Sequence, residues 1–199
     1  MCKEFDPGND RMRDLAKGIE FGLDAQGGKN TSVKCLPTHI SSLPTGKECG
    51  RFLSLELTTS SIEICLIDIE GRSEEVASNQ VVPKVPVEVF SKEYELSDKL
   101  KTSKSKGEKL FDRLAEALKQ FVQEKKLEST QLLLAFTFPF AVDQESLTKG
   151  KLVNWSKGFN CPGVVGEDVV VLLQDSLKKI DLKNIEVPTN ISKIITTKS

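Results

Sequence analysis

The chain has 199 residues, with 28 lysines and arginines, 29 aspartates and glutamates and a formal charge of −1. Hydrophobic residues make up 38% and charged residues 29%, a balance typical of a globular domain and not of a disordered chain. The near-neutral charge gives no indication of nucleic-acid binding, and no run approaches the roughly 20 apolar residues of a membrane span. We therefore expect one domain, or one domain with an appendage, that binds neither nucleic acid nor membrane.

The cysteines and the start of the chain bear on its location. Five cysteines lie far apart and form no C-x-x-C pair, so they indicate neither a zinc site nor a disulfide framework. The first seven residues hold no apolar run of the kind found in signal peptides. Both features predict a cytoplasmic protein. The one histidine, His39, has no second histidine to share a metal, which favours a structural or solvated role.

The first elements are a helix and two strands. Apolar residues at helical spacing predict a helix from Met12 to Leu23, ended by Gly27-Gly28. Two β-strands are predicted next, Phe52–Leu57 and Ile62–Ile69, joined by the turn Thr58-Thr59-Ser60-Ser61.

The following stretch is less regular. Val81–Phe90 contains Pro83 and Pro86, so it can form an edge strand at best. Six lysines between Lys92 and Lys109 alternate with acidic residues, a pattern typical of a solvated loop.

The second half of the chain alternates helix and strand. A helix with one apolar face is predicted from Gly107 to Lys126, and a buried strand from Leu132 to Phe138. A second helix is predicted from Glu167 to Lys179, with acidic residues at its start and lysines at its end, as the helix dipole favours. The order of elements predicts an α/β domain with a mixed sheet.

Three segments resemble the hexokinase family. They are Leu36-Pro-Thr with Gly50-Arg-Phe-Leu-Ser-Leu-Glu-Leu; Val82-Pro-Lys-Val-Pro-Val-Glu-Val with Gly107-Glu-Lys-Leu-Phe-Asp; and Phe136-Thr-Phe, Gly150, Asn154-Trp-Ser-Lys-Gly-Phe159 and Gly166-Glu-Asp-Val-Val. The third is similar to the sugar-binding segment of the family and is the most specific of the three.

The resemblance implies a fold and a division of the chain. Residues 31–199 would form the small lobe of a hexokinase, a ribonuclease H-like or actin-like ATPase fold with a mixed sheet flanked by helices. Residues 1–30 would form an amino-terminal helix and link. The chain stops near the point where the family crosses into its second lobe, so that lobe, with two sugar-holding glutamates and the adenosine pocket, would be absent.

The phosphate turn implied by the resemblance departs from the family pattern. The family sequence Asp-Leu-Gly-Gly-Thr-Asn falls on Glu56-Leu-Thr-Thr-Ser-Ser61. Its glycines let a phosphate approach backbone N–H groups, whereas β-branched Thr58 and Thr59 obstruct that approach. The arginine expected soon after falls on Glu63, which would repel phosphate. A hydroxyl-rich hairpin turn is thus the favoured interpretation of Thr58, Thr59, Ser60 and Ser61.

The sugar and base positions implied by the resemblance are also altered. The Ser-Phe-Pro loop falls on Pro139-Phe140-Ala141 and loses its hydroxyl, and the Thr-Lys pair becomes Ser156-Lys157. The Asn-Asp pair that holds the base falls on Thr189-Asn190, and an amide has no usable basic lone pair. No catalytic residue is therefore expected. The candidate sugar contacts are Ser156, Lys157, Thr189 and Asn190, although the first two could equally be plain surface residues.

These features lead to a functional expectation with open alternatives. The chain is expected to be a non-catalytic pseudo-hexokinase with at most weak hexose binding and a regulatory or interaction role, without the Mg-ATP that the family uses. The alternatives are half of an active ATP-dependent hexokinase completed by a separate second half, and a decayed fragment. The apolar side of the first helix, with Met12, Leu15 and Ile19, suggests self-association or a protein partner, unless the helix folds back on its own domain.

Overall fold

The computed structural model describes residues 8–24, 39, 49–69, 87–102, 104 and 106–187. Helix α1, Gly8–Asp24, confirms the first predicted helix and lies in a unit of its own, Met1–Pro37. Its side chains Met12, Leu15 and Ile19 are each more than half exposed. The expected domain boundary between residues 30 and 31 lies outside the described residues.

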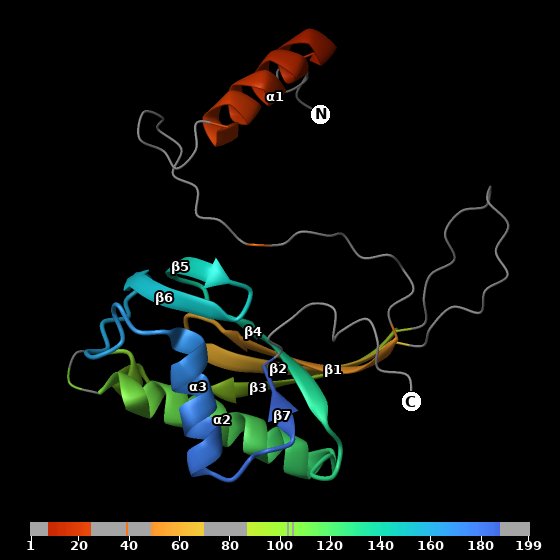
Figure 1. Cartoon of the computed structure of the whole chain (residues 1–199), viewed down its shortest axis with the longest axis vertical. Coiled ribbons are helices and arrows are strands. Elements are labelled where there is room, and N and C mark those ends of the chain that lie inside the picture. Colours follow the sequence, from red (N-terminus) through yellow and green to blue (C-terminus); the bar gives the residue numbers. More distant parts are fainter. Residues whose placement is uncertain are drawn as a thin grey trace, which may run out of the picture. The chain divides into compact units, whose positions relative to one another are not determined.

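The second unit, Thr38–Ser199, is built on a five-stranded sheet with the order β3-β2-β1-β4-β7 (Figure 1). β1 is antiparallel to β2, and β2 to β3, whereas β4 is parallel to both β1 and β7. The predicted mixed sheet is therefore confirmed. The strands are β1 Gly50–Leu57, β2 Ser61–Ile69, β3 Val87–Glu95, β4 Leu132–Thr137 and β7 Ile185–Glu186.

Two helices, α2 (Gly107–Glu124) and α3 (Val169–Lys179), cover the same face of this sheet (Figure 1). Period-2 alternation explains which face is covered, because every second residue of a strand points to the same side. In β1 these residues are leucines with no exposed surface, and β2 and β4 continue the layer. Burying each such side chain contributes about 1.5–3 kcal/mol, so this face holds the core. The largest fully buried side chains are Phe111, Phe121, Leu53, Leu55, Leu57, Ile62, Ile64, Leu110, Leu114, Leu118, Leu132 and Leu134.

Helix α3 begins where its sequence provides a cap. Asp168 Oδ1 accepts hydrogen bonds from the backbone N–H groups of Val170 at 2.9 Å and Val171 at 3.3 Å. The last turn of the helix contains Lys178 and Lys179, whose positive charges interact favourably with the negative end of the helix dipole. The predicted helix is confirmed, with Asp168 outside it as the N-cap.

Strand β3 corrects two predictions. It is an edge strand as expected and continues past Phe90 to Glu95, whereas residues 81–86 of the predicted segment lie outside the described residues. The solvated-loop interpretation is therefore wrong for Lys92 and its neighbours, and also for the 3₁₀ turn η2, Asp98–Leu100. The physical reason for the strand is long-range pairing: all nine residues of β3 pair with β2, and Lys92 Nζ also donates to both carboxylate oxygens of Glu124 on α2, at 2.5 and 2.6 Å.

A two-stranded hairpin was not predicted. Strands β5 (Ala141–Ser146) and β6 (Lys149–Asn154) pair with each other and not with the main sheet. Most of their residues are exposed or half-buried, so the period-2 apolar signal of a core strand is weak.

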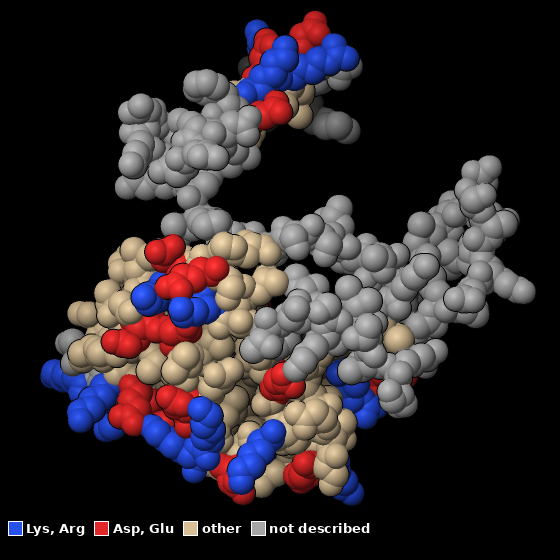
Figure 2. Space-filling model, in the orientation of Figure 1, with Lys and Arg blue, Asp and Glu red and all other residues tan. Residues whose placement is uncertain are grey.

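The surface carries mixed charge. On the face drawn in Figure 2, basic and acidic side chains of the described residues are interspersed, without a broad area of one sign. Within the described part of the chain, no helix has the length and apolarity needed to cross a bilayer.

Candidate functional site

One edge of the sheet collects two of the segments selected from the sequence. β1, β4 and β7 run in the same direction, and Glu56 at the end of β1 lies beside Thr137 at the end of β4. The turn Thr58–Ser61 and the segment Pro139–Ala141 therefore leave the sheet at the same edge. In open α/β sheets, ligands bind outside the carboxyl ends of the strands. This edge is accordingly the place to look for a site.

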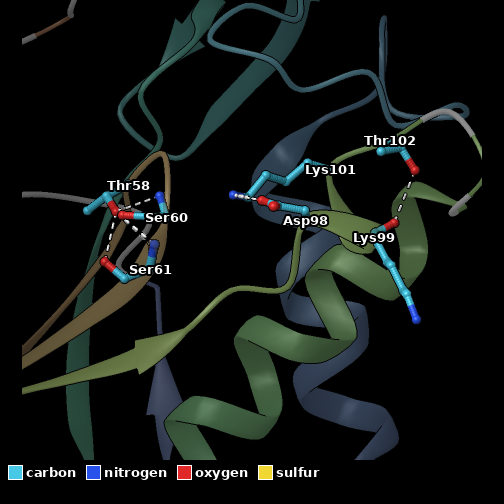
Figure 3. Close-up of polar contacts among 7 residues, drawn as sticks. All are labelled: Thr58, Ser60, Ser61, Asp98, Lys99, Lys101 and Thr102. Carbon is cyan, nitrogen blue, oxygen red and sulfur yellow. Dashed lines mark hydrogen bonds and ion pairs between the residues drawn. The ribbon is translucent and has the colours of Figure 1, made fainter.

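The turn Thr58–Ser61 uses its own backbone donors (Figure 3). The Thr58 N–H donates to the Ser61 carbonyl at 2.9 Å. Thr58 Oγ1 accepts from the N–H groups of Ser60 at 3.3 Å and Ser61 at 3.0 Å, and the Thr58 and Ser61 hydroxyls are 2.8 Å apart. A phosphate bound at a turn needs such N–H groups to be free. The hydroxyl-rich hairpin turn is present, and three of its four backbone donors are already engaged.

The electrostatic surroundings of this turn are negative. Glu56 lies directly across from Glu63 on β2, and Glu63 lies directly across from Glu93 on β3. All three side chains are exposed, and none forms an ion pair with a residue that the structure describes. Burial raises the pKa of the nearby Cys65 thiol, and the charges of Glu63 and Glu56 raise it further. This row of carboxylates repels a phosphate group.

Ser156 and Lys157 lie in a tight turn after β6. The Phe159 N–H donates to the Ser156 carbonyl at 3.0 Å, and Lys157 and Gly158 have φ values of 54° and 83°. The left-handed conformation is ordinary for Gly158 but uncommon for a lysine. Both the Ser156 and Lys157 side chains are exposed, and neither bonds to another described residue. They are free to contact a ligand.

The polypeptide around this turn is firmly attached to the domain. Trp155 Nε1 donates to the Cys161 carbonyl at 2.8 Å, the Asn160 N–H donates to the Lys101 carbonyl at 2.7 Å, and Cys161 Sγ lies 3.0 Å from the Leu100 carbonyl. Burial raises the pKa of the Cys161 thiol. The segment Trp155–Cys161 is thus attached to η2.

An aromatic cluster joins the same segment to the carboxyl edge of the sheet. The ring centroid of Phe140 lies 4.8 Å from that of Phe138, 4.7 Å from that of Trp155 and 5.0 Å from that of Phe159. Such edge-to-face pairs contribute about 0.5–1.5 kcal/mol each beyond their buried area. The structure therefore brings the Pro139–Ala141 and Trp155–Phe159 segments together. The alternating Phe136, Phe138 and Phe140 were the sequence signal that could have predicted this cluster.

Lys101 is a further charged group beside this segment (Figure 3). Its Nζ lies 2.6 Å from Asp98 Oδ1, the bond drawn in Figure 3. The same Nζ lies 6.0 Å from the ring centroid of Phe159. The Lys101 side chain is only 14% exposed, whereas that of Asp98 is 92% exposed. The hydrogen bond from Lys101 holds the pKa of Asp98 below its ordinary value. Sequence reasoning missed this pair because both residues lie in the stretch interpreted as a solvated loop.

Two candidate residues cannot be placed. Thr189 and Asn190 lie outside the described residues, beyond Val187. Strand β7 runs toward the carboxyl edge, but its two residues pair with Leu132 and Leu133 at the start of β4. Whether Asn190 meets Ser156 and Lys157 stays a prediction.

The other polar residues and the cavity that the structure describes add no further candidate site. His39 is exposed, and its Nε2 lies 2.6 Å from the Gln144 carbonyl. No cluster of histidine, cysteine, aspartate or glutamate within the described ranges is suited to a metal ion. A cavity of about 440 Å³ lies between α3 and β7, with Gln174, Lys178 and Leu182 in its walls, and contains none of the candidate residues.

The fold is a mixed-sheet α/β domain, and its carboxyl edge gathers the turn Thr58–Ser61 and the segment Pro139–Ala141. The whole stretch from residue 1 to 193 matches the family model described as Hexokinase, and the chain belongs to the hexokinase family. The family resemblance stated from the sequence is therefore confirmed.

Curated relatives support this assignment. A hexokinase from Brugia malayi is 32% identical over 198 residues, which cover 98% of this chain and 32% of that protein. Hexokinase-3 from Rattus norvegicus is 34% identical over 188 residues, covering 92% of this chain and 19% of that protein. The chain thus spans a third or less of the length of these relatives.

Solved structures agree with the fold. A Schistosoma mansoni hexokinase complexed with glucose superposes with a TM-score of 0.71 at 28% identity, over 87% of this chain and 36% of that one. A second hexokinase crystal structure gives a TM-score of 0.70 at 23% identity, over 91% of this chain and 41% of that one, and bears on the fold alone.

Proposed function

We propose that this chain is a hexokinase-like module that does not transfer phosphate, binds a hexose weakly if at all, and acts as a regulatory or interaction protein. The observation that carries the proposal is the turn Thr58–Ser61, whose backbone donors bond to Thr58 Oγ1 and to the Ser61 carbonyl. Mg-ATP would meet an occupied turn and the carboxylates of Glu56 and Glu63. The residues present do not fit a nucleotide phosphate.

The position aligned with the family's base supports the same proposal. Asn190 carries an amide there, and an amide cannot accept the proton of an attacking hydroxyl. Loss of a general base alone typically costs about 10²- to 10⁴-fold in rate. Loss of organised phosphate contacts adds a factor of similar size.

Weak hexose binding rests on Ser156 and Lys157. The relative from Schistosoma mansoni was solved with glucose, and the corresponding segment here keeps a hydroxyl and an ammonium on an attached loop. Both side chains are exposed, so a sugar would exchange water contacts for protein contacts with little net gain. We expect millimolar affinity or none.

The test is a coupled assay of the purified chain with Mg-ATP and glucose, fructose or mannose. The expected result is no sugar-dependent turnover above background. A rate of about 1 s⁻¹, ordinary for an enzyme, would overturn the proposal. In parallel, glucose should shift the amide resonances of residues 155–159, and Lys157→Ala should abolish those shifts.

A second candidate is one half of an active hexokinase, and the intact support of the Trp155–Cys161 segment favours it. Here the chain would contribute Ser156 and Lys157, and a separate second half would supply the two sugar-holding glutamates and the adenosine pocket. Turnover that appears only after the second half is added would establish this candidate in place of the first.

A further inference from the structure

Strand β3 has a long edge that no other described strand covers. It has nine residues, pairs with β2 and forms the outer strand of the sheet. The Leu96 N–H donates to the Ser60 carbonyl, which fixes the alternation of the antiparallel ladder. By that alternation Val89, Ser91 and Glu93 direct their N–H and C=O groups away from β2. The outward groups of these three residues have no hydrogen-bond partner among the described residues. Farther along the same edge, the Glu95 carbonyl accepts a hydrogen bond from Arg113 at 3.3 Å.

Two apolar side chains of β3, Val89 and Phe90, lie exposed between the charged residues Glu88 and Lys92. Val89 is 57% exposed and Phe90 is 44% exposed. Lys125 Nζ lies 4.5 Å from the centroid of the Phe90 ring and forms no ion pair with a described residue. An open edge with exposed apolar side chains is a template for pairing with another strand.

The charges of β3 indicate what that other strand is. If two copies of β3 pair antiparallel about a two-fold axis at Phe90, Glu88 of each copy lies opposite Lys92 of the other. The same register sets Phe90 against Phe90, and Val89 against Ser91, whose outward backbone groups then exchange hydrogen bonds. An axis at Lys92 would oppose two lysines, and an axis at Ser91 would lose both ion pairs. The strand is therefore complementary to itself in one register.

We propose that two copies of this chain associate through β3, centred on Phe90, and join their five-stranded sheets into one continuous sheet. Glu88 has no ion pair within the described part of its own chain and gains Lys92 of the partner copy, whose Nζ also bonds Glu124 of α2. The interface is isologous, as expected for a symmetric dimer. It is distinct from α1 and does not depend on the proposed function.

Charge exchange tests this register. Glu88→Lys places like charges opposite Lys92, and Lys92→Glu places like charges opposite Glu88, so each variant should weaken self-association by about tenfold or more. An equal mixture of the two variants should restore a dimer, because each reversed position then faces its complement in the other copy. Sedimentation of the 199-residue chain measures the first effect, and native mass spectrometry of the mixture measures the second.

Control variants separate pairing from damage to the fold. Ser91→Pro removes one outward N–H from the edge without breaking the β2 ladder, and should also dissociate the dimer. Lys109→Glu, an equal charge change at an exposed position of α2, should leave the dissociation constant unchanged. A wild-type chain that sediments as a 22.0 kDa monomer at high concentration would overturn the proposal. A mixture that stays monomeric, or association that survives both reversals, would overturn it as well.

Discussion

Thr58 organises its turn with a single side-chain oxygen. That oxygen accepts from two backbone N–H groups, and the Ser61 hydroxyl lies beside it. The bond from the Ser61 N–H is partly buried, so this donor would be left unpaired without the Thr58 oxygen, whereas the exposed Ser60 N–H could bond to water. Buried donors left unpaired cost about 1–3 kcal/mol.

Thr58→Val is expected to lower the free energy of unfolding by about 1–2 kcal/mol, since valine keeps the shape and removes the acceptor. The matched control is Thr59→Val, because the Thr59 side chain is exposed and forms no hydrogen bond with a described residue. Urea unfolding of both variants measures the difference. Equal effects of the two substitutions would show that the Thr58 hydroxyl does not support the turn.

Asp98 provides a pH-dependent test of the attachment between η2 and the Trp155–Cys161 segment. The hydrogen bond from Lys101 lowers the pKa of Asp98 below its ordinary value of 3.8. A carboxylate with a depressed pKa in the folded state stabilises the fold above the unfolded-state value. That contribution is lost as the pH falls through the lower folded-state pKa.

The unfolding midpoint of Asp98→Asn should therefore lie below that of the wild type at neutral pH. The difference should persist down to about the ordinary pKa of 3.8 and disappear at lower pH. Parallel urea titrations at several pH values measure it. A difference that grows on acidification would have the wrong sign for this pair.

For single residues, the sequence predicts hydrogen bonds between residues that are close together in the chain. The Thr58–Ser61 turn was predictable because its partners are three residues apart. The Lys101 contact with Phe159 was not, because only the tertiary fold brings the two residues together. The sequence shows Lys101 only as one lysine among six.

Among the elements, α2 shows how a glycine permits close packing. Gly107 begins the helix and donates its N–H to the Pro162 carbonyl at 3.0 Å. A Cβ at this position would lie 2.0 Å from Val164 Cγ2 and 3.0 Å from that carbonyl. Val164 is fully buried and cannot move into solvent.

Gly107→Ala should destabilise the domain by about 1–3 kcal/mol through overpacking. Adding Val164→Ala should recover part of the loss, because it removes the clashing atom. Gly18→Ala in α1 is the control, since no atom lies within 4 Å of the position that its new methyl group would take and alanine favours a helix by roughly 0.5–1 kcal/mol. The thermal unfolding midpoints of the three variants measure these effects. An unchanged midpoint for Gly107→Ala would contradict the packing argument.

The elements were predictable where they pack on one large core. The helical face of α2 and the strands β1, β2 and β4 carry strong periodicity because each is buried on one side. The hairpin β5–β6 lacks that signal, and the extent of β3 depends on its pairing with β2 and on the bond from Lys92 to Glu124. Such pairings are long-range and leave no local pattern.

For the whole molecule, α1 is the part whose apolar surface indicates a partner. Met12, Leu15 and Ile19 lie on one side of the helix, and burying each would contribute about 1.5–3 kcal/mol. We expect this side to bind another protein or a second copy of α1. Leu15→Asp with Ile19→Asp should abolish that association.

This measurement belongs in the Glu88→Lys background, where pairing through β3 is suppressed. Lys17→Asp, which makes the same change in net charge on the same helix, should leave association unchanged. Light scattering gives the mass of the species. A monomer whose α1 amides are protected from hydrogen exchange would show that the helix folds back on its own domain, contrary to this expectation.

The sheet order has a consequence for synthesis. β1, β2 and β3 are adjacent in the chain and can pair as soon as they leave the ribosome, whereas β4 reaches β1 only after α2. Until then the inner edge of β1 is open to other nascent chains. A ribosome stalled after Gln131 should therefore carry an aggregation-prone, chaperone-bound chain, and one stalled well beyond Thr137 should carry a protected chain.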